Sequence, residues 1–151
     1  MHKYLVLLFF VSAISSTAVA AESPTNHYAI LPTSEGAALL KQCSRTVPQN
    51  VTNYWTPSPS QIAELEKRMP EFLRKNGFKL PFSNFNFQYV GMTVRGKQLI
   101  YVNAFPRHII ENQKDWRTKP VIICDGGEAF WGVVFEPADN TFHDLQSNGV
   151  A

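Results

Sequence analysis

The densest apolar run beyond the first twenty residues occupies residues 119–137, and the sequence Cys-Asp-Gly-Gly interrupts it. Its two halves, residues 121–124 and 129–135, are short and rich in valine, isoleucine and aromatic residues. Proline and glycine bound them, a pattern that favours buried strands over a helix. Because glycine tolerates positive φ, residues 125–128 are expected to turn the chain. The run therefore predicts a central β-hairpin.

Alternation of apolar and polar residues predicts further strands downstream of residue 77. Between residues 85 and 94, aromatic and aliphatic residues alternate with asparagine and glutamine, as in a half-buried strand. Arg-Gly-Lys then turns the chain at 95–97, and residues 98–105 supply the partner strand of a second hairpin. A turn at 137–140 precedes a last alternating strand over residues 141–145.

The clearest helix begins after Ser58. Ser58 as N-cap, Pro59 at the first helical position and Gln61 three residues after the cap form a capping-box signature. Pro70 interrupts the pattern, which predicts either a kink or the meeting of two helices, and Gly77 is a plausible stop. Apolar residues at helical spacing give this segment one buried face: Ile62, Leu65, Met69, Phe72 and Leu73.

Helices followed by about five strands in successive hairpins indicate an α+β fold with an antiparallel sheet. We expect the capped helix to lie across one face of a curved sheet, as in cystatin-like or NTF2-like architectures. A single domain is expected over residues 58–151. Residues 21–57 are expected to be a lead-in, a short helix capped by Ser34, and a linker.

The first twenty residues have the features of a secretory signal peptide. Lys3 precedes an apolar run of about ten residues, and Ala18-Val19-Ala20 has the small-x-small pattern of a cleavage site. The run is shorter than the roughly 20 residues that a spanning helix requires. Cleavage after Ala20 removes Lys3 and leaves 13 basic and 12 acidic side chains. We therefore expect an exported protein, periplasmic or secreted, with no membrane span after cleavage and no nucleic-acid partner.

Two cysteines, Cys43 and Cys124, belong to the mature chain. In an exported protein such a pair predicts one disulfide. The closed loop of about 80 residues would be worth roughly 4 kcal/mol on the chain-entropy model.

A cysteine-dependent hydrolase or transferase is the enzymatic alternative. Cys124 lies beside two glycines whose N–H groups would suit an oxyanion, and His143 is expected on a nearby strand as the base. Against this reading, Asp125 next to the thiol disfavours the thiolate. Adjacent residues on a strand also point to opposite faces, so His143 and Asp144 are not expected to cooperate.

Other chemistry has weaker support. Asp125, Glu128 and His143 match no zinc spacing, so no metal or other cofactor is expected. Glu128 and Glu136 are candidates for a glycosidase pair only if they face each other across a cleft. Asn50-Val51-Thr52 fits the N-glycosylation pattern, which matters only in a eukaryote.

Binding is the function that the pattern favours most. Trp55, Arg107, Trp116 and Arg117 come from loops that flank the expected sheet, and tryptophan and arginine are enriched at interface hot spots. The partner is a protein or a small ligand, and the protein is an inhibitor or accessory factor in this interpretation. A structural envelope component is the third alternative. Either the 85–89 stretch or the last strand is left as an exposed edge for strand addition.

Overall fold

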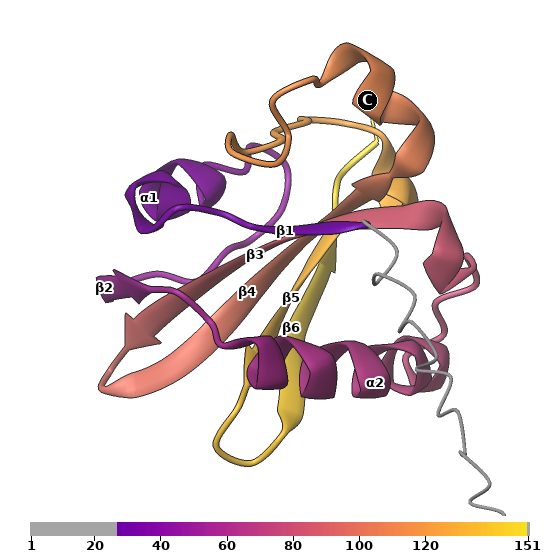
Figure 1. Cartoon of the computed structure of the whole chain (residues 1–151). Coiled ribbons are helices and arrows are strands. Elements are labelled where there is room, and N and C mark those ends of the chain that lie inside the picture. Colours follow the sequence, from indigo (N-terminus) through magenta and orange to yellow (C-terminus); the bar gives the residue numbers. More distant parts are fainter. Residues whose placement is uncertain (1–26, 151) are drawn as a thin grey trace, which may run out of the picture.

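The computed structural model describes residues 27–150, except for the side chains of residues 110–112, and the expected signal peptide lies outside the described residues. The described chain is an α+β fold built on an open, mixed sheet of six strands (Figure 1). The strands are β1 (Tyr28–Ile30), β2 (Val51–Trp55), β3 (Phe85–Val94), β4 (Lys97–Pro106), β5 (Trp131–Glu136) and β6 (Thr141–Ser147). The helices are α1 (Gly36–Leu39) and α2 (Pro59–Lys75), with 3-10 turns η1 (Thr33–Glu35), η2 (Phe82–Asn84), η3 (Arg107–Asn112) and η4 (Gly127–Ala129).

Two of the predicted hairpins are confirmed. β3 and β4 pair antiparallel over their full lengths, from Phe85↔Pro106 to Val94↔Lys97. β5 and β6 form the other hairpin around residues 137–140. The sheet order is β1-β3-β4-β5-β6, so β6 is an edge strand and β3 is internal. Of the two stretches proposed as an exposed edge, only the last strand has that position.

The predicted central hairpin is wrong. Residues 121–124 form no strand, and β5 pairs instead with β4 on one side and β6 on the other. Both edges of β5 are therefore occupied, which leaves no partner for residues 121–124. This short apolar run lies on one face of the sheet, where Val121 packs against Phe105 and Trp116.

The lead-in and linker expected before residue 58 contribute strands to the same sheet. β1 pairs parallel with the Phe87–Tyr89 part of β3, which makes the sheet mixed. β2 pairs antiparallel with the rest of that edge, up to Trp55↔Gly91. A Cβ on Gly91 would lie 2.5 Å from the Trp55 carbonyl oxygen, so only glycine permits this close approach. The segment before residue 58 thus supplies two strands of the sheet, β1 and β2, and is not a peripheral lead-in.

The long helix matches its sequence signature. The Ser58 hydroxyl accepts from the Gln61 N–H, and the Gln61 side chain accepts from the Ser58 N–H. α2 is one helix, with Pro70 on its exposed side. Its buried side chains Ile62, Leu65, Met69 and Leu73 pack on one face of the sheet. The predicted Ser34 cap is wrong: α1 begins after Glu35, and no side chain caps it.

The opposite face of the sheet is covered without a long helix. Figure 1 shows α2 on one side of the strands, and α1 with the loop of residues 113–124 on the other. Leu31 and Leu39 pack there on Val90, Met92 and Tyr101. The segments that cover this face are largely irregular, so their backbone N–H and C=O groups need hydrogen-bond partners outside a helix.

Candidate functional site

Buried amide side chains on the sheet hold the covering loop in place. Gln88 donates to the carbonyl oxygens of Trp116 and Lys119 and accepts from the Val121 N–H at 2.9 Å. Asn103 donates to Gln88 Oε1 at 3.0 Å and to the Val121 carbonyl at 2.9 Å. Because buried backbone groups need partners, these amides replace the hydrogen bonds that a helix or strand would supply. Their role is structural.

A buried arginine extends this cluster to the disulfide. Arg45 donates through Nε to the Tyr101 hydroxyl at 3.1 Å, through Nη1 to Asn148 Oδ1 at 2.8 Å, and through Nη2 to Asn103 Oδ1. Burial raises the pKa of Tyr101, and the Arg45 charge opposes that shift. All three partners are neutral oxygens, so the guanidinium is already occupied by the fold. Arg45 therefore anchors residues 43–45 to the sheet and is not available to a ligand.

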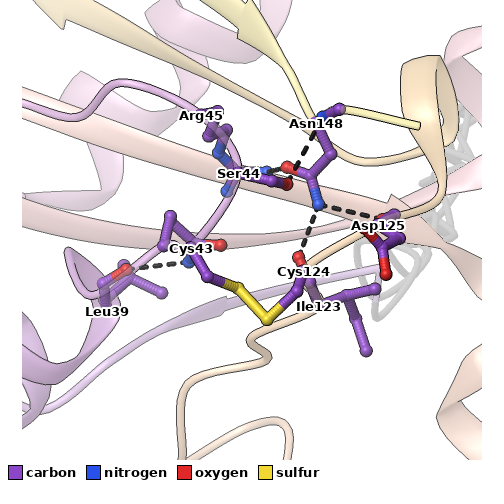
Figure 2. Close-up of a disulfide and its surroundings, with 10 residues drawn as sticks. Leu39, Cys43, Ser44, Arg45, Ile123, Cys124, Asp125 and Asn148 are labelled. Atoms are coloured by element: carbon purple, nitrogen blue, oxygen red, sulfur yellow. Dashed lines mark hydrogen bonds between the residues drawn. A yellow bond between two sulfur atoms is a disulfide. The ribbon is translucent and has the colours of Figure 1, made fainter. Parts of the chain in front are cut away.

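The Cys43–Cys124 disulfide is confirmed, with 2.05 Å between the sulfurs and 5.0 Å between the Cα atoms. Figure 2 shows Asn148 beside it: Nδ2 donates to the carbonyl oxygens of Ile123 and Asp125, the two neighbours of Cys124. The Gly149 N–H donates to the Ser44 carbonyl at 3.2 Å. Three segments that are distant in sequence therefore meet at the disulfide: residues 43–45, 123–127 and 148–149.

This arrangement removes the nucleophile of the cysteine-hydrolase hypothesis. A disulfide sulfur is not a thiolate, which is the nucleophilic form. Asn148 holds the chain beside Cys124 through its bond to the Ile123 carbonyl. His143 pairs with Val134 and lies five residues before Asn148 along the chain. At about 3.3 Å per residue, that separation is roughly 15 Å. The structure does not bring the two proposed catalytic residues together.

His143 and Asp144 are in contact, contrary to the expectation from strand alternation. The pairing register shifts between Gly132 and Val134, and Asp144 has a φ of 55°. A bulge of this kind places successive side chains on the same side of a strand. His143 Nδ1 and Asp144 Oδ2 are 2.8 Å apart. Because a carboxylate is an acceptor, this contact places a proton on Nδ1 and directs Nε2 away from Asp144.

A second polar cluster joins α2 to the face of the sheet on which this helix packs. Glu66 Oε1 accepts from the Tyr89 hydroxyl at 2.8 Å and lies 3.1 Å from His27 Nε2. Burial first, and then the Glu66 carboxylate, raise the pKa of Tyr89. The cluster connects the residue before β1 with α2 and β3, so it stabilises the packing of these three elements.

A cavity of about 390 Å³ lies where β3 begins and β4 ends. The turns η2, η3 and η4 converge there, and each contributes to the lining. The apolar lining residues are Leu80, Phe85, Pro106 and Ala129, and the polar ones are Ser83, Asn84, Arg107 and His108. Leu80 is 41% exposed, one of two large apolar side chains classed as exposed in the described part of the chain. An apolar pocket with a few polar groups is the usual form of a small-molecule site.

Arg107 is the one predicted binding residue that lines this cavity. Its Nε donates to the Phe85 carbonyl at 3.2 Å, and the guanidinium has no other hydrogen-bond or ion-pair partner among the described side chains. The backbone bond fixes one side of the planar group and leaves the terminal nitrogens to a ligand. Among the described side chains that line the cavity, none is acidic. The cavity is therefore an apolar space with a cationic side.

The other predicted binding residues lie elsewhere. Trp116 is only 5% exposed and packs edge-on against Phe105 at 5.8 Å between ring centroids. Arg117 lies over the Trp116 ring at 4.3 Å and donates to the Tyr28 carbonyl at 3.1 Å. Trp55 is half-buried at the end of β2. The four residues do not form one surface, and Trp116 belongs to the core.

The carboxylates that the sequence offered for metal binding or glycoside hydrolysis do not form a common site. Among the side chains that the structure describes, no group of three or more His, Cys, Asp or Glu is placed to hold a metal ion. Glu128 in η4 and Glu136 lie at opposite ends of β5. Glu136 is also paired with Lys97 at 2.8 Å.

Sequence reasoning missed most of the cavity. Asn84, Pro106 and Ala129 belong to three separate segments with no shared motif, and the first two meet because β3 and β4 pair at Phe85↔Pro106. No helix in the described part of the chain is long and apolar enough to cross a membrane.

No known family model, no curated protein and no solved structure matches this chain.

Proposed function

We propose that this protein is exported and acts by binding a small ligand with an apolar body and an anionic group. The site is the cavity between η2, η3 and η4, which we call the Arg107 cavity. The observation that carries this proposal is an apolar-walled space of about 390 Å³ with one fixed guanidinium on its lining.

The dimensions and lining support a small molecule as the ligand. Small-molecule pockets typically measure about 300–1,000 Å³ and combine apolar walls with few polar groups. Leu80, Phe85, Pro106 and Ala129 offer an apolar surface to the ligand body. Two of the lining turns, η2 and η3, adjoin the paired ends of β3 and β4, and η4 leads into β5, so the sheet positions all three.

Arg107 supports an anionic group on that ligand. A guanidinium whose Nε is held by the Phe85 carbonyl loses less conformational entropy when it binds an anion than a mobile side chain would. Arginine also matches the planar geometry of carboxylate and phosphate groups. Asn84 and His108 add polar groups to the same lining.

Export is the second part of the proposal. The Cys43–Cys124 disulfide is compatible with an oxidising compartment, since such bonds are rare in the cytosol. The N-terminal pattern provides the other argument, through the expected cleavage after Ala20.

Two related dyes test the cavity. 1-Anilinonaphthalene-8-sulfonate carries an apolar body and a sulfonate, and N-phenyl-1-naphthylamine has the same skeleton without the charge. We expect Arg107→Gln to weaken binding of the sulfonate about tenfold, or ~1.4 kcal/mol, and to leave binding of the neutral dye unchanged. Leu80→Ser should weaken both. Arg74→Gln, at an exposed position on α2 away from the cavity, is the control.

Circular dichroism of each variant is needed, because the sulfonate dye also binds partly folded states. Equal losses of both dyes in Arg107→Gln would contradict the anionic part of the proposal. A native protein that binds neither dye saturably would contradict the whole proposal and favour a structural envelope role. A cysteine-dependent hydrolase would instead require turnover that is lost in Cys124→Ser, and the disulfide argues against it.

A further inference from the structure

A second cavity, of about 240 Å³, lies at the other end of β3 and β4. Residues 48–50, the β3–β4 turn, β5 and the bulge in β6 form its walls. The lining residues are Pro48, Gln49, Asn50, Val94, Arg95, Leu99, Val134, His143 and Asp144. β3 spans ten residues, so this cavity is about 30 Å from the Arg107 cavity. We call it the His143 cavity.

The polar groups of the His143 cavity have few partners in the protein. Neither the Arg95 guanidinium nor the Asn50 side-chain amide makes a hydrogen bond or ion pair with a described residue. His143 uses Nδ1 on Asp144, which leaves Nε2 available. Below these groups, Val94, Leu99 and Val134 provide an apolar floor. Three potential donors thus border one small, partly apolar hollow.

The backbone around this cavity is also unusual. Four non-glycine residues in the described chain have positive φ, and three of them line the His143 cavity: Asn50 at 58°, Arg95 at 50° and Asp144 at 55°. Asparagine and aspartate tolerate this conformation, but arginine does not favour it. Residues held in such conformations are concentrated at functional sites.

Arg95 is the most informative of the three. Arg95 and Gly96, at 50° and 79°, are the two central residues of the β3–β4 turn, and two positive φ values define a type I′ turn. Asn-Gly is the strongly preferred pair at these positions. An arginine here costs local stability, and its guanidinium makes no compensating hydrogen bond or ion pair with the described residues.

We propose that the His143 cavity binds an oxyanion, a carboxylate or a tetrahedral group such as phosphate, through Arg95, Asn50 and His143. Arg95 and the Asn50 amide donate to the anion, and protonated His143 donates through Nε2. With Nδ1–H on Asp144, neutral His143 presents a lone pair at Nε2, so it becomes a donor only when it takes up a proton.

The charges of the lining give the pH dependence its sign. Besides His143, the ionisable lining residues are Arg95 and Asp144, while residues 48–50 and Val134 contribute no charge. The formal charge is therefore zero with neutral His143 and +1 with protonated His143. Anion binding is expected to be tighter at low pH, where the imidazole is protonated, and to take up a proton.

Sulfate and acetate are suitable probes between about pH 5.5 and about pH 8.5, on either side of the range in which histidines titrate. Over that range the charge of sulfate is constant, and acetate is compared at equal concentrations of its ionised form. NMR titrations at constant ionic strength would follow the Gly96 backbone amide in every variant, and also the His143 imidazole where it is present. We expect a saturable shift in the wild type and a larger dissociation constant at the higher pH. Saturation by sulfate alone indicates a tetrahedral oxyanion as the natural ligand, and saturation by acetate alone indicates a carboxylate.

The variants separate binding from folding. Arg95→Asn places the preferred residue in the turn, so it should maintain or raise the urea midpoint while weakening anion binding about tenfold. His143→Gln should weaken binding at low pH and abolish the pH dependence. Arg74→Gln should change neither.

Three results would overturn the proposal. The first is a wild type that shows no saturable shift with either anion. The second is unchanged binding in Arg95→Asn and His143→Gln. The third is an equal loss in Arg74→Gln, which would indicate a general effect of net charge.

Discussion

Removal of the disulfide tests how the segments around Cys43 and Cys124 are held on the sheet. The perturbation is the double variant Cys43→Ala/Cys124→Ala, which leaves no unpaired thiol. Both cysteines are exposed, so the substitutions remove little buried apolar surface. The hydrogen bonds of Arg45 and Asn148 do not involve the sulfur atoms. The main change is therefore the loss of the covalent link.

The magnitude follows from the length of the closed loop. A sequence separation of 81 residues corresponds to a loss of about 4.5 kcal/mol on the chain-entropy model. This is a large part of the roughly 5–15 kcal/mol by which domains are stable, so the variant should be folded but marginal. Urea unfolding followed by tryptophan fluorescence measures the change. With a slope of about 2 kcal/mol/M, the midpoint should fall by roughly 2 M.

The slope itself is a second readout. Without the link the unfolded chain is less compact, so unfolding exposes more surface and the slope should increase. Reduction of the wild type should reproduce both changes. A loss below about 1 kcal/mol with an unchanged slope would refute this reasoning, because it would show that the link does not restrict the unfolded chain.

Two further predictions concern the cap and the buried tyrosines. Ser58→Ala should destabilise the protein by about 1 kcal/mol, because Ser58 caps α2, whereas Ser34→Ala should be neutral, because Ser34 caps no helix; urea unfolding measures both. The pKa of Tyr89 is raised in the folded state by burial and Glu66, so above about pH 10 the unfolded chain loses a proton that the folded chain retains, and stability must fall. Tyr89→Phe should reduce this alkaline loss and leave the part due to Tyr101, whose pKa is raised too. An alkaline slope unchanged in Tyr89→Phe would contradict the assignment.

Local patterns in the sequence determined much of the architecture. The capping box of Ser58 and Gln61, the strand over residues 85–94 and the turn at Arg95-Gly96 follow from local patterns, and all three appear in the structure. The strand is buried on both faces from Phe85 to Met92, however, and not half-buried as its alternation predicted. Local chemistry is sufficient there because each element is specified by its own caps, turns and periodicity. The Cys43–Cys124 bond was also predictable, since two cysteines permit only one intramolecular pairing.

Tertiary structure decided the rest. The apolar run at 121–124 became loop because β4 and β6 already occupy both edges of β5. β1, only three residues long, is a strand because the edge of β3 accepts it. The Arg107 cavity and the His143 cavity combine residues from separate turns, strands and loops. No local pattern predicts that these residues come together. Their positions depend on the pairing register of the strands and on the bulge at Asp144, which brings neighbouring side chains to the same side of the strand.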